Sequence, residues 1–107
     1  MLHSGIQEPN GGVARYHYTD RRQNAGISTE ITGYAVSAFV YLHKATGDPR
    51  YLDAGIRAGR YLCREAWDDA SSTFPFEPLQ PGVQAYLYFF DLGIIVRGLL
   101  TLWRATG

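Results

Sequence analysis

The stretch HKATGDPRYL, residues 43–52, decides the fold, because it reads as the end of one helix, a tight turn and the start of another. Gly47 suits the left-handed backbone that often ends a helix, Asp48 is a good N-cap, and Pro49 fits the first helical position. The chain ends on WRATG, residues 103–107, which repeats the first half of this turn sixty positions later. We therefore expect that the last glycine stands where a turn into another helix begins, and that the chain is a fragment of a repeating protein.

Three helices are predicted around this turn. The first covers residues 28–46, with Ser28 and Thr29 as candidate N-caps, and is apolar nearly all round. The second covers residues 48–67 and has apolar side chains at helical spacing on one side only, which is typical of a helix that faces solvent. The third covers residues 90–106 and is again apolar nearly all round, so the first and third helices need burial on more than one side.

Two regions lack a helical pattern. Residues 1–27 read as irregular, with a turn cluster and a short alternating segment from Val13 to Tyr18. Residues 68–89 form a loop that carries three prolines, which exclude a helix and a central strand alike. We expect residues 1–107 to be a single domain or part of a larger one.

The first helix repeats in the third. A shift of sixty positions places Gly33 on Gly93, Val36 on Val96, Leu42 on Leu102 and Ala45-Thr46-Gly47 on Ala105-Thr106-Gly107. A helix that is apolar all round, then a one-sided helix, then another apolar helix is the order that a ring of helical hairpins requires. We therefore predict an all-α fold of helical hairpins, with inner helices that contact their ring neighbours and an outer helix that contacts only the inside.

These residues resemble the α/α-toroid proteins, especially the six-hairpin glycosidase-like and related bacterial sugar-processing proteins. The resemblance covers residues 11–107 and is carried by Gly11-Gly12-Val13, Glu30-Ile31-Thr32-Gly33-Tyr34, the turn TGDPRYL at residues 46–52, and Phe90-Asp91-Leu92-Gly93. It implies a partial toroid of about one and a half helical hairpins. It also implies a role in carbohydrate metabolism as part of a glycoside hydrolase, lyase or epimerase that is inactive as a fragment. The turn motif specifies the toroid better than any one activity.

Glu30 and Asp91 are the candidate catalytic residues. Both fall near the start of an inner helix, and inner helices of a toroid run the same way, so both carboxylates would lie at one mouth of the ring. Their separation could match either the ~5 Å or the ~6.5–9.5 Å used in glycoside hydrolysis, and the sequence does not choose. The alternative is that each only stabilises its helix N-terminus. Because a helix N-terminus lowers the pKa of a carboxylate, we expect a base or nucleophile here rather than a general acid.

Four residues are candidates for substrate binding: Tyr16, His17, Tyr34 and Arg97. Sugars bind through aromatic faces and a few placed polar groups, so Tyr16 and His17, ahead of the first helix, could line the same mouth. Packing under a loop is the alternative for both. Arg97 lies two turns into an apolar helix and needs a buried acidic partner, a route to the surface, or an open cavity in which it could bind a carboxylated sugar.

Composition argues against several other classes of function. Ten basic side chains balance ten acidic ones and no basic cluster exceeds the pair Arg21-Arg22, so we expect neither a nucleic-acid nor a membrane partner. No two histidines have metal-ligand spacing, and phosphate-binding and dinucleotide-binding fingerprints are absent, so we expect no metal and no cofactor. No signal peptide is visible and Cys63 is the single cysteine, which favours a cytoplasmic protein and a buried packing thiol.

Two functions follow as hypotheses. In the first, the chain belongs to a carbohydrate-processing toroid enzyme whose partners are a saccharide and the remainder of the ring. In the second, it is a non-catalytic helical-repeat scaffold or self-association module. Three helices cannot cover two that are apolar all round, so the second hypothesis predicts pairing with another copy of the chain.

Overall fold

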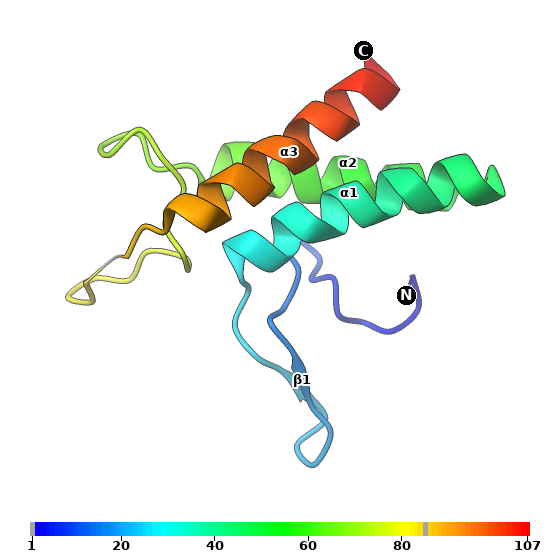
Figure 1. Ribbon diagram of the computed structural model, residues 1–107. Coiled ribbons are helices and arrows are strands. Elements are labelled where there is room, and N and C mark those ends of the chain that lie inside the picture. Colours follow the sequence, from blue (N-terminus) through cyan, green and yellow to red (C-terminus); the bar gives the residue numbers. More distant parts are fainter. Residues whose placement is uncertain (1, 85) are drawn as a thin grey trace.

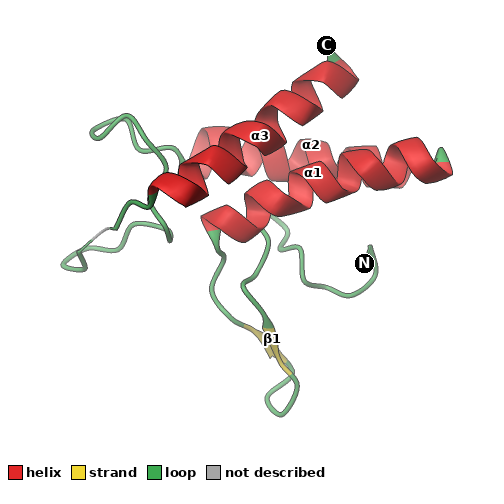
Figure 2. Ribbon diagram, viewed as in Figure 1, coloured by secondary structure: helices red, strands yellow, loops and turns green. Residues whose placement is uncertain are grey.

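The computed structural model describes residues 2–84 and 86–107. Its three long helices are α1 (Thr29–Thr46), α2 (Pro49–Tyr61) and α3 (Phe89–Thr106), and a short π-helix, η1 (Leu62–Ala66), continues α2. A small antiparallel hairpin, β1 (His17–Tyr18) and β2 (Gln23–Asn24), precedes α1 (Figure 1). Loops make up the rest of the described chain (Figure 2). The fold is mostly helical, and the three predicted helices are confirmed within a residue or two of their expected ends.

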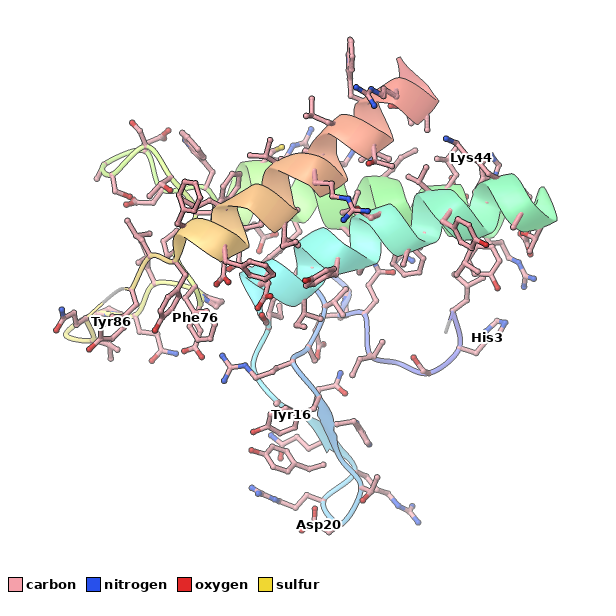
Figure 3. The ribbon with its side chains drawn as sticks, viewed as in Figure 1. His3, Tyr16, Asp20, Lys44, Phe76 and Tyr86 are labelled. Carbon is pink, nitrogen blue, oxygen red and sulfur yellow. The ribbon has the colours of Figure 1, made fainter. Side chains whose placement is uncertain are left out.

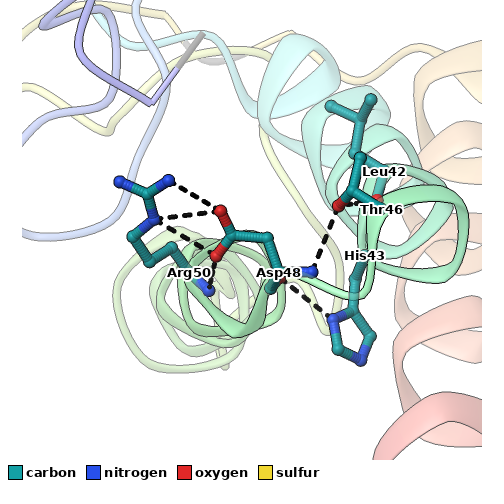
Figure 4. A network of polar contacts seen from close by, with 5 residues as sticks. All are labelled: Leu42, His43, Thr46, Asp48 and Arg50. Carbon is teal, nitrogen blue, oxygen red and sulfur yellow. Dashed lines mark hydrogen bonds and ion pairs between the residues drawn. The ribbon is translucent and has the colours of Figure 1, made fainter.

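The predicted turn between α1 and α2 is confirmed in detail (Figure 4). Gly47 has the left-handed backbone, at φ 72°, and its N–H donates to the carbonyl oxygen of His43. The carboxylate of Asp48 accepts a hydrogen bond of 2.9 Å from the N–H of Arg50, which caps α2, and Pro49 follows at the first helical position. Each residue of the turn therefore takes the place that its conformational preference predicts.

The sequence repeat is also a structural repeat. Helices α1 and α3 both contain 18 residues, and their ends differ by sixty positions. The hydroxyl of Thr46 donates to the carbonyl oxygen of Leu42 at 2.7 Å, and the hydroxyl of Thr106 donates to that of Leu102 at 2.9 Å. Both helices end on a glycine with positive φ. The same local chemistry thus ends both helices.

Helices α1 and α3 pack closely against each other. They begin on the same side of the molecule and run in the same general direction, with α2 behind them (Figure 1). Two glycines permit the contact: a Cβ at Gly98 would lie 2.5 Å from the carbonyl oxygen of Gly33, and a Cβ at Gly33 would lie 3.0 Å from the Cα of Ile95. The two first turns are consequently held at one end of the helix pair.

Two clusters of apolar side chains form the core. The first joins the three helices to the proline-rich loop and contains Val36, Ala58, Tyr61, Leu62, Ala66, Phe74 and Ile95. The second joins α1 and α2 to the N-terminal segment and contains Val13, Ala35, Phe39 and Ala54. Small residues of α2 allow the close packing, since Leu102 of α3 occupies the space beside Gly59.

Three local features differ from the sequence-based expectations or refine them. The second helix widens at its end, where the N–H of Trp67 donates to the carbonyl oxygen of Leu62 at 3.0 Å. Cys63 is exposed, so the predicted buried thiol is wrong, because the cysteine lies on the side of η1 that faces away from the core. In the proline-rich loop Phe74 is buried, whereas Leu79 is exposed.

Among the described residues, no helix has the length and apolar content to cross a membrane.

Candidate functional site

The first turns of α1 and α3 bring two carboxyl groups together. Glu30 lies in the first turn of α1 and Asp91 in the first turn of α3. Because the two helices start at the same end of the pair, the charge of Asp91 reaches Glu30 and contributes to the rise of the Glu30 pKa. The structure therefore places the two candidate catalytic residues at the same end of the helix pair, near enough for one charge to act on the other, and their chemical role stays a prediction.

Asp91 is buried without a hydrogen-bond partner for one of its oxygens. The residue is 7% exposed, and no described residue donates to its Oδ2. Tyr88, the N-cap residue of α3, makes no side-chain capping bond, and α1 is capped by the hydroxyl of Ser28, which accepts from the N–H of Ile31 at 3.2 Å. Helix capping therefore does not explain why Oδ2 of Asp91 is buried, because this oxygen accepts no hydrogen bond from the described residues. Ser28 already caps α1, so α1 does not need Glu30 as its cap.

Burial shifts the pKa of both carboxyl groups in the same direction. It raises the pKa of Asp91, and burial followed by the neighbouring charge of Asp91 raises the pKa of Glu30. The prediction that a helix N-terminus lowers these pKa values is wrong, because loss of hydration outweighs the attraction of the helix dipole here. A carboxyl group with a raised pKa can act as a proton donor, so the pair can supply an acid as well as a base.

An open groove runs beside the carboxyl pair, between α1 and α3. It encloses about 370 Å³ and is lined by Tyr34, Ser37, Ala38, Tyr41, Ile94 and Arg97. Tyr34 lies one helical turn along α1 from Glu30, and Ile94 lies one turn along α3 from Asp91. Neither Glu30 nor Asp91 lines the groove, which begins about one helical turn along from them and continues toward the C-terminal ends of the helices.

Arg97 faces this groove and is exposed. No ion pair joins it to any acidic side chain in residues 2–84 and 86–107. Of the alternatives left open by the sequence, a buried acidic partner is therefore wrong. Its guanidinium is available to an anionic group placed in the groove.

Tyr16 and His17 lie elsewhere. They belong to the hairpin, which projects from the helices and carries Tyr16 away from them (Figure 3). Nδ1 of His17 lies 2.8 Å from Oδ1 of Asn24 across the two strands, and Tyr16 lines a separate hollow between the hairpin and the proline-rich loop. The structure thus separates both residues from Glu30 and Asp91, because cross-strand contacts hold them on the hairpin.

The sequence-based prediction missed four of the six residues that line the groove, and two of these, Ser37 and Tyr41, carry hydroxyl groups. The signal for them was present, because positions 30, 34, 37 and 41 share one face of a helix. A single face of α1 thus carries an acid, two tyrosines and a serine hydroxyl. Such a surface combines apolar area with hydrogen-bonding groups.

No cluster of three metal-ligating side chains occurs within the part of the chain that the structure describes. The chain matches no model of a known protein family, no curated protein and no solved structure. Its function is therefore inferred from the carboxyl pair and the groove.

Proposed function

We propose that this chain belongs to a carbohydrate-processing protein of α/α-toroid architecture, a glycoside hydrolase, lyase or epimerase. Glu30 and Asp91 form its acid and base, and the groove between α1 and α3 holds the sugar. One observation carries the proposal: Asp91 is buried with an oxygen that has no partner among the described residues, within reach of a second carboxyl group and about one helical turn from an open groove.

The two carboxyl groups take different roles because their surroundings differ. Burial raises the pKa of Glu30 and the charge of Asp91 raises it further, so Glu30 takes the part of the proton donor. Asp91 is the charged group in this interaction, so it acts as the base or nucleophile. The charge of Asp91 then opposes ionisation of Glu30.

The groove has the features of a sugar site. Tyr34 and Tyr41 offer aromatic surface, and Ser37 and Arg97 offer hydrogen-bond donors. Arg97 favours a sugar that carries a carboxylate, because a guanidinium binds a carboxylate through two parallel hydrogen bonds. Further helices would close the open side of the groove, so sugar binding is a more direct test of the chain than turnover.

Saturation-transfer NMR tests the proposal with two matched panels of oligosaccharides, one neutral and one that contains uronic acids. We expect signal from the uronates, loss of that signal in Tyr34→Ala, and a selective loss for the acidic sugars in Arg97→Gln. Tyr16→Ala is the control, since this tyrosine lies outside the groove, and it should bind like the parent chain. The absence of any sugar signal, or equal binding by Tyr34→Ala, would reject the proposal.

Turnover is tested in a protein that contains the closed ring. Asp91→Asn and Glu30→Gln should each abolish product formation while a bound sugar is still detected by NMR. Retained turnover in either variant would exclude the carboxyl pair as the catalytic groups.

A second candidate function is a helical-repeat scaffold or self-association module. One observation favours it: α3 exposes several large apolar side chains, among them Phe89, Phe90, Val96, Leu100 and Trp103. Light scattering over a concentration series tests this function. Growth of the particle mass with concentration supports it, and a well-folded monomer at every concentration contradicts it.

A further inference from the structure

One face of α3 is apolar and bare. It consists of Phe89, Gly93, Val96 and Leu100, which helical spacing places on one side of the helix. All four are exposed, and Val96 and Leu100 are each 49% exposed. No titratable side chain belongs to this set, which we call the bare face.

The sixty-residue repeat gives each residue of the bare face an equivalent on α1. The equivalents are Thr29, Gly33, Val36 and Val40, and all four are buried. Val36 is 0% exposed and Val40 is 1% exposed. The same positions of two equivalent helices thus have opposite exposure.

Helix α3 itself covers this face of α1. The Cα of Ile95 lies 3.0 Å from the position of a Cβ at Gly33, and a Cβ at Gly98 would lie 3.4 Å from the Cβ of Val36. The contact therefore places an aliphatic residue and a glycine, three positions apart on α3, against a glycine and a valine on α1. It leaves no room for side chains at either glycine.

We infer that the bare face is the docking surface for one further helix of the α3 type. That helix runs parallel to α3 and presents an aliphatic residue followed by glycine three positions later, as Ile95 and Gly98 do. Gly93 and Val96 receive it as Gly33 and Val36 receive α3, so the docking continues the interface that already joins the first two parallel helices. The inference does not depend on the proposed activity.

The chemistry of the bare face favours a helix over other occupants. A sugar or an anionic polymer would need hydrogen-bond donors or charge, which the four residues of the bare face lack; Arg97 lines the groove, and Arg104 lies beyond Leu100 in the last turn of the helix. A glycine on an apolar helix surface allows another backbone to approach closely, as Gly33 does. The valine three positions after this glycine then fills the space beside the approaching helix, as Val36 does on α1.

Fluorescence anisotropy tests the docking with the whole chain and one probe. The probe is a labelled peptide with the sequence of residues 89–106 and lysines appended at both ends for solubility. It should bind the chain, and Gly93→Leu in the chain should weaken binding at least about tenfold through overpacking. Gly98→Leu in the peptide should weaken binding equally.

Two further variants make the outcome unambiguous. Thr101→Leu adds the same side chain on another side of α3 and should leave binding unchanged. Circular dichroism verifies that the Gly93→Leu chain is folded, and a leucine in place of glycine favours the helix. Absence of binding, or binding that Gly93→Leu does not change, would overturn the inference. Binding lost only in Gly33→Leu would also overturn it, because the peptide would then be displacing α3 from α1.

Discussion

At the scale of single residues, Asp91 is the most unusual group in the described chain. Its carboxyl group lies between two helices, one oxygen has no partner, and burial raises its pKa. A charge at a helix N-terminus gains only about 0.3–1 kcal/mol when it is exposed to solvent, so the dipole does not offset the loss of hydration. The fold therefore tolerates a buried carboxyl group whose pKa is raised above its ordinary value.

The first prediction follows from the direction of this pKa shift. Because the pKa of Asp91 is raised on folding, the folded state holds its proton over a pH range in which the unfolded state has lost it. The contribution of Asp91 to stability therefore falls as the pH rises from the ordinary aspartate value, about 4, through the higher folded pKa. Asp91→Asn removes this loss, so the free energy of unfolding of the variant relative to the parent should rise with pH.

Urea denaturation at several pH values between acid and neutral measures this difference. Asp53→Asn is the control for the substitution itself, because Asp53 is exposed in the middle of α2, away from the first turns of α1 and α3. A difference for Asp91→Asn that is constant over the whole range would contradict the prediction. Glu30 titrates beside Asp91, so the same series in Glu30→Gln separates the two groups.

At the scale of helices and turns, the cap of α2 carries a prediction of its own. Asp48 accepts from the N–H of Arg50 and also pairs with the Arg50 guanidinium at 2.7 Å. An exposed ion pair contributes little, whereas loss of an N-cap costs about 0.5–2 kcal/mol. Asp48→Ala should therefore lower the free energy of unfolding by about 1 kcal/mol.

Asp48→Asn tests which of the two interactions matters. The asparagine keeps a capping oxygen but loses the charge, so its stability in urea should stay close to that of the parent. Equal destabilisation by both variants would mean that the ion pair, rather than the cap, holds the turn.

The two glycines of α3 give a matched pair of substitutions. A Cβ at Gly98 would meet the backbone of α1 at 2.5 Å, whereas a Cβ at Gly93 meets nothing within 4 Å. Gly98→Ala should therefore destabilise the chain by about 1–3 kcal/mol through overpacking. Gly93→Ala should stabilise it by about 0.5–1 kcal/mol through helix propensity. Thermal unfolding followed by circular dichroism measures both, and a gain in stability for Gly98→Ala would be inconsistent with the close packing of α1 and α3.

Sequence predicted the helices and the turn well because their signals are local. A capping serine, the Gly47-Asp48-Pro49 turn and the apolar spacing each act within a few residues. The buried state of Asp91 was beyond this reach, since it depends on how closely Gly33 lets α3 approach α1. The groove was predicted only in part, because Tyr34 and Arg97 were named while the other four lining residues, Ser37, Ala38, Tyr41 and Ile94, were not.

At the scale of the whole molecule, the hairpin stands apart from the helices. Long-range contacts fix it, because the side-chain amide of Asn24 donates to the carbonyl oxygen of Gly5 and to Oε1 of Glu8, both at 2.8 Å. Such contacts join residues that are distant in sequence and have no local pattern. This explains why the sequence did not separate Tyr16 and His17 from the carboxyl pair.

Hydrogen exchange should report this division between hairpin and helices. Amides in residues 33–40 of α1 lie mostly in buried residues and should exchange slowest, through opening of the whole fold. Amides in residues 17–24 belong to the two-stranded hairpin and should exchange fastest among the hydrogen-bonded groups. Rates are compared after correction for intrinsic exchange, and hairpin protection equal to that of α1 would show that the hairpin belongs to the same cooperative unit.

The widened turn at η1 has an evolutionary consequence. The N–H of Trp67 donates to the carbonyl oxygen of Leu62, five positions earlier. In an α-helix the corresponding hydrogen bond joins residues four positions apart, so this turn contains one extra residue. Three of them, Cys63, Arg64 and Glu65, are exposed, so deletion of one would shorten the exposed arc while Leu62 and Ala66 keep their place in the core. Natural variation in chain length can therefore accumulate here without disturbing the register of the remaining helices, and an alignment of related sequences should open a gap at this turn.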